Sequence, residues 1–219
     1  MQLFLDGSDI DKIRKYCELG LIDGVTTNPS IILKSGKNMI EVISELAGIV
    51  SGSVSAEVSA LDSDTMVQEG IKLAEIAENV TVKLPITWDG LKACKTLSNK
   101  GISVNMTLCF SSSQALLAAK AGAEYVSPFI GRLDDLNLEG IDLISDIKLI
   151  YSNYKFSTKI LAASIRTINH VKQCARFGAD VATIPLDIFE KLVKHPLTDS
   201  GLSQFTADWE KTGQSIISV

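Results

Sequence analysis

The chain has 219 residues, of which 46% are hydrophobic and 21% charged, and its formal net charge at pH 7 is −5. This composition is that of a globular protein with a substantial core, and without a basic run a nucleic-acid or anionic-membrane partner is disfavoured. The sequence has neither a signal-peptide pattern nor a long apolar run, so we expect a cytoplasmic protein. The widely spaced cysteines predict reduced thiols, not zinc ligands or disulfides.

Short β-prone runs alternate with longer stretches of helical apolar spacing along the chain. The runs end in polar or turn residues, as strands do. We predict eight strands, with the ranges Gln2–Asp6, Gly24–Asn28, Val54–Val58, Val80–Leu84, Ser103–Leu108, Tyr125–Phe129, Ile160–Ser164 and Val181–Ile184.

Helix patterns lie between these strands. Asp64–Glu78 and Ser112–Ala121 begin with capping residues, and we expect Asn79, Gly122 and Gly178 to end their helices. Strands joined by crossover helices pair in parallel, and eight such units of roughly 25 to 30 residues predict a (β/α)8 TIM barrel. The alternative is an open doubly wound sheet, disfavoured because no G-x-G-x-x-G follows the first strand.

The C-terminal region predicts an addition to the barrel. An eighth helix is expected at Leu186–His195, a break at KHPLTDSG, and an extra helix at Leu202–Lys211 with Phe205 and Trp209 on one face. These aromatic side chains either pack on their own barrel or dock on a neighbouring subunit. We expect one TIM-barrel domain over residues 1–219, with a helical extension from about residue 200.

Polar residues collect where the predicted strands end. In such barrels the reacting groups lie at the carboxyl ends of the strands, because packed side chains fill the interior below. A single Thr, Ser or Asn at such a place is more commonly a hydrogen-bonded strand terminus than a catalytic group, but seven of the eight strands contribute here. The residues are Asp6, Thr26, Thr27, Asn28, Glu57, Lys83, Asn105, Thr107, Ser127, Phe129, Arg132, Ser164 and Arg166.

Lys83 is the least ordinary of these residues, because it lies in the apolar strand VTVKLP. An ammonium group there is costly to desolvate unless it is paired. One interpretation is structural, with the lysine reaching solvent or pairing with a carboxylate. The other is that burial favours the neutral amine, which can attack a ketone and form a Schiff base.

Proton transfer and phosphate binding need further groups. His170 and His195 fall outside the strand ends, so we expect the carboxylates of Asp6 and Glu57 to move protons, or to pair with Lys83 or an arginine. Arg132 and Arg166 follow adjacent strands, and with Ser164 they predict a side-chain phosphate clamp. Either arginine alone is equally consistent with a surface position.

Seven segments in order resemble the small transaldolase family, which also contains fructose-6-phosphate aldolases. The resemblance covers essentially the whole chain, and several of its motifs together are highly specific. The segments are LFLDGSD around Asp6, GVTTNPSII around Asn28, AEVSA around Glu57, VKLP around Lys83, NMTLCFS around Asn105 and Thr107, AGAEYVSPFIGR around Arg132, and LAASIRT around Ser164 and Arg166.

This resemblance implies a (β/α)8 barrel in which Lys83 forms a Schiff base with the C2 carbonyl of a ketose phosphate. Asp6 matches the residue that takes the proton from the C4 hydroxyl, and Glu57 and Thr107 match the pair that holds a catalytic water. No metal or cofactor is implied. The other implied contacts are to the three-carbon unit, from Thr26, Asn28, Asn105 and Ser127, and to the phosphate, from Arg132, Ser164 and Arg166.

Two positions separate the activities within this family. Transaldolases resemble this chain in having Glu57 in the AEV segment and Phe129 in SPF, in the substrate-binding set, where the aldolases have Gln and Tyr. We therefore expect transfer of a dihydroxyacetone unit between sugar phosphates in the pentose phosphate pathway. Ile165 stands where an aromatic residue is often found, which leaves acceptor preference open.

Other functions stay open at this level. A fructose-6-phosphate aldolase with the same lysine chemistry is the nearest alternative, followed by a non-catalytic sugar-phosphate-binding barrel and a generic isomerase barrel. Small family members are often ring-like decamers built from pentamers, so the resemblance implies a homo-oligomer that Leu202–Lys211 could help to assemble.

Overall fold

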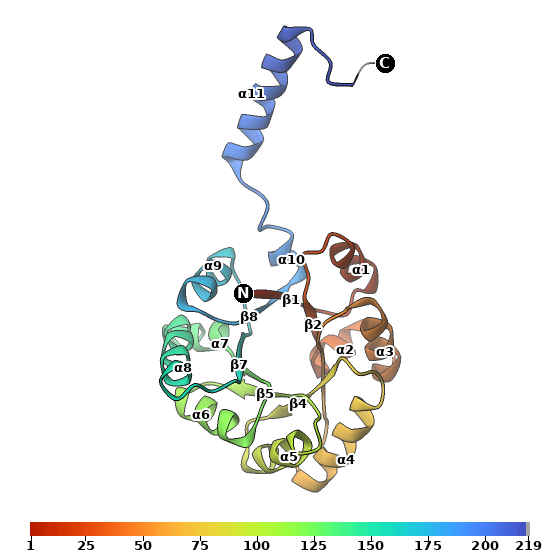
Figure 1. Cartoon of the computed structure of the whole chain (residues 1–219), viewed down its shortest axis with the longest axis vertical. Helices are drawn as coiled ribbons and strands as arrows, with labels where there is room; N and C mark the ends of the chain where they lie inside the picture. Colours follow the sequence, from red (N-terminus) through yellow and green to blue (C-terminus); the bar gives the residue numbers. More distant parts are fainter. Residues whose placement is uncertain (218–219) are drawn as a thin grey trace.

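A computed structural model describes residues 1–217, and its strands form a ring surrounded by helices (Figure 1). Within those residues, eight parallel strands pair in chain order and β8 pairs back with β1 to close the barrel. The predicted (β/α)8 barrel is confirmed, and the open-sheet alternative is wrong. The strands are β1 Gln2–Asp6, β2 Gly24–Thr26, β3 Val54–Glu57, β4 Val80–Pro85, β5 Val104–Cys109, β6 Tyr125–Pro128, β7 Lys159–Ala162 and β8 Val181–Pro185.

Several strands are shorter than predicted, and local chemistry explains the clearest case. β2 ends at Thr26 because Asn28 is the N-cap of the next helix, where its side chain accepts a hydrogen bond from the Ile31 amide at 3.0 Å. Pro29 then occupies the first helical turn, where its missing N–H has no cost. β7 likewise ends before Ser164, whose backbone is left-handed with φ 59°.

Helices cover the outside of the barrel, two of them following β2 and two following β6. The helix Ser112–Ala121 has its predicted bounds, but Asp64–Glu78 is observed as Ser63–Ala74, capped by Asp62. Asn79 ends no helix; its side chain donates to the carbonyls of residues 47, 50 and 52 instead. The helices before the C-terminal region are α1 Ile10–Glu18, α2 Pro29–Ser35, α3 Met39–Ile49, α4 Ser63–Ala74, α5 Trp88–Ser98, α6 Ser112–Ala121, α7 Ile130–Asp134, α8 Gly140–Tyr154 and α9 Ile168–Phe177.

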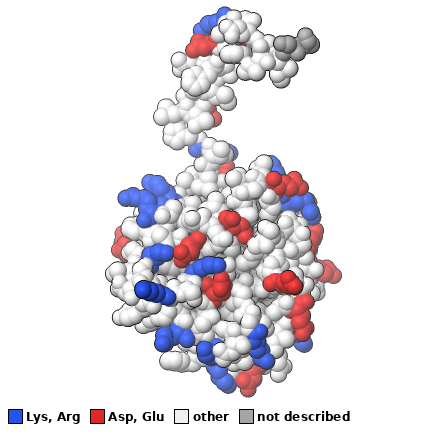
Figure 2. All heavy atoms as spheres, viewed as in Figure 1, with Lys and Arg blue, Asp and Glu red and all other residues white. Residues whose placement is uncertain are grey.

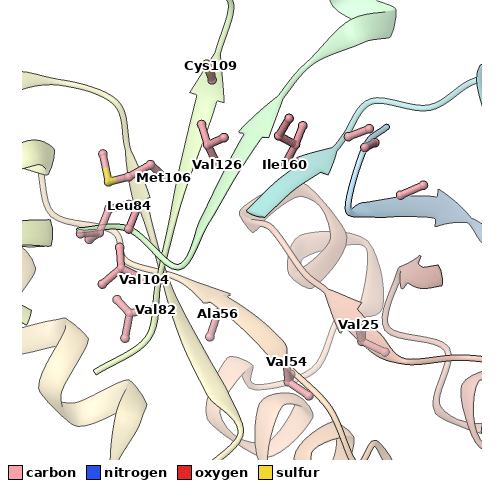
Figure 3. Close-up of a cluster of buried hydrophobic side chains, with 14 of the residues drawn as sticks. Val25, Val54, Ala56, Val82, Leu84, Val104, Met106, Cys109, Val126 and Ile160 are labelled. Atoms are coloured by element: carbon pink, nitrogen blue, oxygen red, sulfur yellow. The ribbon is translucent and has the colours of Figure 1, made fainter. Parts of the chain in front are cut away.

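Alternate residues of each strand face opposite sides of the barrel wall, which produces two separate apolar layers. The outer layer packs the strands against the helices, and Figure 3 shows part of it, including Val82, Leu84 and Met106. The inner layer fills the barrel and contains Phe4, Tyr125, Leu161 and Val181. Polar inward-facing residues such as Asn105 and Thr183 are buried in the same interior.

Gly24 leaves the space that the inner side chain of Phe4 occupies. A Cβ atom there would lie 2.5 Å from the ring of Phe4, whose strand pairs with β2 at this register. The missing side chain therefore lets the Phe4 ring fill the barrel interior beneath the residues at the carboxyl end of β1.

The C-terminal region differs from its prediction. Helix α10 is short, Leu186–Phe189, and α11 begins at Pro196 and runs to Thr212, so most of the predicted break is helical. His195 caps α11 by accepting a hydrogen bond from the Leu197 amide at 3.2 Å, and proline again suits the first turn. The break is confined to the tight turns between α10 and His195.

Helix α11 projects away from the barrel (Figure 1). Phe205 is 73% exposed and Trp209 44%, and none of the described residues of α11 is buried. The interpretation in which these aromatic side chains pack on their own barrel is therefore wrong.

The surface carries charges of both signs. On the face shown in Figure 2, Lys and Arg side chains alternate with Asp and Glu over the barrel, whereas most of the projecting C-terminal segment is uncharged. Among the residues that the structure describes, no helix combines the length and apolarity needed to cross a membrane.

Candidate active site

A cavity of about 150 Å³ opens at the carboxyl ends of the strands. It gathers side chains from β1, β2, β4, β6, β7, β8 and α7, and from the segments that follow β2, β6 and β7. Most residues predicted for the site line it directly. Its lining consists of Asp6, Thr26, Asn28, Lys83, Ser127, Phe129, Arg132, Leu161, Ala163, Ser164 and Thr183.

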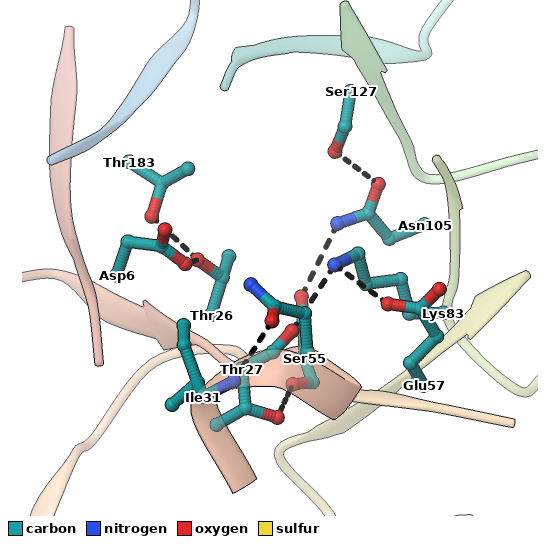
Figure 4. A network of polar contacts seen from close by, with 11 residues as sticks. Asp6, Thr26, Thr27, Ile31, Ser55, Glu57, Lys83, Asn105, Ser127 and Thr183 are labelled. Atoms are coloured by element: carbon teal, nitrogen blue, oxygen red, sulfur yellow. Dashed lines mark hydrogen bonds and ion pairs between the residues drawn. The ribbon is translucent and has the colours of Figure 1, made fainter. Parts of the chain in front are cut away.

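Lys83 forms a buried ion pair with Glu57. Its Nζ atom lies 3.0 Å from Glu57 Oε2, with 6% and 15% of the two side chains exposed, and 3.1 Å from the carbonyl oxygen of Thr27 (Figure 4). The two residues face each other across the β3–β4 pair. The carboxylate pairing considered from the sequence therefore occurs, and it also leaves Glu57 in place to take a proton from the amine.

Asp6 belongs to a second hydrogen-bonded group. The Thr26 hydroxyl donates to Asp6 Oδ1 at 2.8 Å, and the hydroxyls of Thr26 and Thr183 lie 2.6 Å apart (Figure 4). Burial raises the pKa of Asp6 above its ordinary value, whereas the Thr26 hydrogen bond and the positive charge of Lys83 oppose the rise, and the negative charge of Glu57 adds to it. The carboxylate is thus tuned toward accepting a proton nearer neutral pH than an exposed aspartate would.

Asn105 is fixed from both sides by buried hydroxyl groups. Ser127 Oγ donates to Asn105 Oδ1 at 2.6 Å, and Asn105 Nδ2 donates to Ser55 Oγ at 3.3 Å. Asn105 also stands beside Lys83 in the β4–β5 register. These contacts hold the amide next to the amine at one level of the barrel.

Thr107 lies one inward-facing position further along β5. Its hydroxyl is buried and has no hydrogen-bond partner among residues 1–217. A buried hydroxyl without a partner is costly, so this atom suits a bound water or substrate oxygen. That observation supports the water-holding role implied by the resemblance.

The β6–α7 segment brings Arg132 and Ser164 together. A Cβ atom at Gly131 would lie 2.2 Å from the Ser164 carbonyl oxygen, which accepts a hydrogen bond from the Gly131 amide at 3.1 Å. Glycine therefore allows α7 to begin directly against the loop after β7. The Arg132 guanidinium lies 5.0 Å from the centre of the Phe129 ring, and both side chains line the cavity.

Arg166 is not among the lining residues in this conformation. It forms a two-pronged ion pair with Asp135, one bond of which joins Arg166 Nη2 to Asp135 Oδ2 at 2.6 Å. This pairing holds the pKa of Asp135 below its usual range. The structure thus brings Arg132 and Ser164 of the predicted clamp to one cavity, whereas the Arg166 side chain is paired with the Asp135 carboxylate.

His170 supports the same loop, although the sequence alone placed it away from the strand ends. Its Nδ1 accepts a hydrogen bond from the Arg166 amide at 3.3 Å, and its Nε2 lies 3.1 Å from Asp134 Oδ2. Consecutive carboxylates at the end of α7, Asp134 and Asp135, therefore anchor the loop that carries Arg166.

Sequence reasoning missed three polar residues here: Ser55, Asp135 and Thr183. Ser55 and Thr183 lie two residues before a strand end, and inward-facing alternation was the signal that could have found them. Asp135 carried no such signal, because its pairing depends on how α7 packs against the loop after β7. Within the described part of the chain, no group of three or more His, Cys, Asp or Glu side chains is placed to hold a metal ion.

Comparisons with known proteins agree over the full length. The family model for transaldolase/fructose-6-phosphate aldolase matches residues 3–216. A protein of Roseobacter denitrificans named probable transaldolase is 65% identical over 99% of this chain and 100% of its own. Proteins with the same name from Dinoroseobacter shibae and Cereibacter sphaeroides are each 61% identical, over 99% and 100% of this chain and all of their own.

A more distant likeness concerns the fold. A thiamine phosphate pyrophosphorylase from Pyrococcus furiosus superposes with a TM-score of 0.57 at 14% identity, covering 84% of this chain and 85% of its own. It supports the barrel architecture and nothing more specific. The full-length family match and the close relatives are specific, and the chain belongs to the transaldolase/fructose-6-phosphate aldolase family.

Proposed function

We propose that this protein is a transaldolase that moves a dihydroxyacetone unit between sugar phosphates of the pentose phosphate pathway through a Schiff base on Lys83. The donor is sedoheptulose 7-phosphate or fructose 6-phosphate, and the acceptor is glyceraldehyde 3-phosphate or erythrose 4-phosphate. The observation that carries this proposal is a buried lysine paired with a carboxylate at 3.0 Å beside the cavity that Asp6 lines.

Imine formation comes first. Glu57 takes a proton from the Lys83 ammonium, and the neutral amine attacks the C2 carbonyl carbon of the donor to give a carbinolamine. Glu57 then returns its proton to the C2 hydroxyl, which leaves as water, and the protonated imine remains. Glu57 and the Thr107 hydroxyl, which has no hydrogen-bond partner among residues 1–217, support the dehydration and later hydration of C2, because both can bind a water molecule beside Lys83.

Cleavage and transfer follow. Asp6 takes the proton of the C4 hydroxyl as the C3–C4 bond breaks, and the electron pair of that bond moves into the protonated imine, which becomes a neutral enamine. The C4 carbon becomes the aldehyde of a shortened aldose phosphate, which leaves the site, while the proton stays on Asp6. The C3 carbon of the enamine then attacks the acceptor aldehyde, and Asp6 returns the proton to the new C4 oxygen. Hydrolysis of the imine releases the product and regenerates Lys83.

Substrate binding uses the remaining polar groups of the cavity. Thr26, Asn28, Asn105 and Ser127 hold the three-carbon unit. The phosphate is held by Arg132, Ser164 and Arg166. Arg166 can reach it only if its guanidinium breaks its ion pair with Asp135 or contacts both groups at once.

A fructose-6-phosphate aldolase is the second candidate function, and Phe129 favours the transferase over it. The ring packs edge-on against Phe110 at 5.8 Å and lies beneath Arg132, so it presents carbon to the cavity and has no hydroxyl to protonate the enamine. The enamine should persist until an aldehyde arrives. Rapid steady release of dihydroxyacetone from fructose 6-phosphate alone would contradict the transferase assignment.

Borohydride reduction in the presence of fructose 6-phosphate tests the lysine chemistry. We expect one covalent three-carbon adduct, mapped by peptide mass to Lys83 and lost in Lys83→Met. The matched control is Lys159→Met, a strand lysine that pairs with Glu124 at 2.8 Å at the other end of the barrel, and it should keep the adduct. The absence of any adduct on the unaltered protein would favour a non-catalytic sugar-phosphate-binding barrel.

We also propose a cytoplasmic homo-oligomer in which α11 docks on a neighbouring subunit, with a decamer of pentameric rings as the expected form. The support is the exposed apolar face formed by Leu202, Phe205 and Trp209 on a helix that leaves its own barrel. Across the described residues the cysteines form no disulfide, as is usual in a reducing compartment.

Light scattering on full-length variants tests the assembly. Phe205→Glu together with Trp209→Glu should lower the particle mass, because two charges would be placed in an apolar contact. Ser203→Glu, on the opposite side of the same helix, should leave the mass unchanged. An unchanged mass in the double variant would contradict docking through this face.

A further inference from the structure

A chain of hydroxyl groups links β8 to the Asp6 carboxylate. Thr183 lies at the centre of β8, beside Phe4 in the β1–β8 register, and its hydroxyl is 2.6 Å from that of Thr26. Thr26 in turn donates to Asp6 Oδ1 at 2.8 Å. The three side chains come from neighbouring strands and point into the same side of the cavity (Figure 4).

Hydrogen counting gives this chain a direction. Each threonine hydroxyl has one hydrogen to donate. When Asp6 is ionised it can only accept, so the Thr26 hydrogen lies on the Thr26–Asp6 contact. The hydrogen between the two threonines must then come from Thr183. The order of donation is therefore Thr183 to Thr26 to Asp6.

Burial protects this arrangement from competition with water. Thr183 and Thr26 are each 3% exposed. Donation from Thr183 satisfies the Thr26 oxygen and polarises its O–H group, which strengthens the bond to the carboxylate. The charged groups around Asp6 are Lys83 on β4, Glu57 on β3 and Arg132 on the cavity wall. The contacts that position these three side chains do not involve Thr183.

We propose that Thr183 is a positioning residue for the reaction: it orients the Thr26 hydroxyl so that Asp6 stays ionised until it takes the proton of the substrate hydroxyl. This inference rests on the proposed role of Asp6. Without the Thr183 hydroxyl, Thr26 can turn its hydrogen away from Asp6, and the ionised carboxylate loses its neutral hydrogen-bond donor.

The test compares variants of Thr183 in the full-length protein. Thr183→Val keeps the shape but removes the hydroxyl, and it should lower kcat by about threefold to tenfold with KM retained. The acid limb of kcat/KM should move to higher pH by about half a pH unit. Thr183→Ser should restore both. The matched control is Thr81→Val, another buried barrel threonine bonded to hydroxyls, which should change neither.

Borohydride trapping separates this inference from the proposed function. Reduction should still join substrate to Lys83 in Thr183→Val, at least as the six-carbon imine that precedes cleavage, because imine formation does not use Asp6 as its base. Absence of the adduct in the unaltered protein would overturn the proposed function. A normal adduct in Thr183→Val together with an unchanged pH profile of kcat/KM would overturn the positioning role alone. Equal impairment of the serine and valine variants would assign Thr183 to packing and also overturn it. If Thr183→Val is too unstable to assay, Thr183→Ala against Thr183→Ser isolates the hydroxyl in the same way.

Discussion

The two ends of the barrel interior are both lined by hydroxyl groups, but the enclosed Lys83–Glu57 ion pair lies at the carboxyl end. At the amino end, Thr81 Oγ1 lies 2.7 Å from Ser53 Oγ and 3.1 Å from Ser103 Oγ, beside a cavity of about 450 Å³. Its carboxylates, Glu78 and Glu124, are exposed to solvent. The carboxyl end has about 150 Å³.

The reactive groups nonetheless lie at the smaller cavity, where Lys83 and Asp6 line the wall and Glu57 pairs with Lys83. Lys83, Glu57 and Asp6 lie close together there with little exposure, so their charges act on one another in a low dielectric. Enclosure of charged side chains, more than cavity size or hydroxyl content, therefore distinguishes the proposed catalytic end of this barrel from the other end. Variants at each end of the barrel test that distinction.

Replacing Lys83 should have the largest effect. Lys83→Met removes the nucleophile, and we expect transaldolase activity to fall by about 10⁴-fold or more in a coupled assay. Lys159→Met at the amino end should stay within about twofold of the unaltered protein. Equal losses of activity in both variants would contradict the proposal that only the carboxyl end is catalytic.

Asp6 should come next. Asp6→Asn removes the base that breaks the C3–C4 bond, and kcat should fall by about 10²- to 10⁴-fold. Because burial raises the pKa of Asp6, the acid limb of the unaltered protein's activity should lie at higher pH than the ordinary aspartate value. An acid limb that Asp6→Asn leaves in place would belong to another group.

The same carboxyl group affects stability with a definite sign. The folded protein binds the Asp6 proton more tightly than the unfolded chain does, so the free energy of unfolding should decrease as pH rises from the ordinary aspartate pKa through the raised one. Asp6→Asn should remove this contribution from urea titrations repeated across that range.

Arg132 should have a smaller effect, confined to substrate binding. Arg132→Ala removes charge-assisted bonds to the phosphate, and KM for fructose 6-phosphate should rise by about tenfold to a hundredfold. Arg176→Ala, an exposed arginine at the end of α9, serves as the control and should change KM little. A similar rise in KM for an unphosphorylated ketose would contradict phosphate recognition by Arg132.

Thr81 should have the smallest effect on function. Thr81→Val breaks two part-buried hydroxyl contacts, so the free energy of unfolding should fall by about 0.5 to 1.5 kcal/mol in urea titrations. Steady-state kcat and its pH profile should not change. A loss of kcat as large as that of Thr183→Val would show that both ends of the barrel affect the chemistry.

The barrel and most of its candidate reactive residues can be predicted from the sequence. Alternation of strands and helices leaves a closed barrel or an open doubly wound sheet as the ways to bury both faces of each strand, and the count of eight units favours the barrel. Lys83 was conspicuous because a charge in an apolar strand needs a reason, and Asp6 and Glu57 stood at strand ends where such barrels place their chemistry.

Which side chains contact one another depends on the tertiary structure. The Glu57–Lys83 pair, the Thr183–Thr26 contact and the pairing of Arg166 with Asp135 each join residues distant in sequence, and each depends on the register in which strands and loops pack. The start of α11 and its separation from the barrel were also beyond local patterns, because an apolar helix face predicts burial without saying against what. Local chemistry specified the elements here, and the long-range geometry of barrel closure specified the partners.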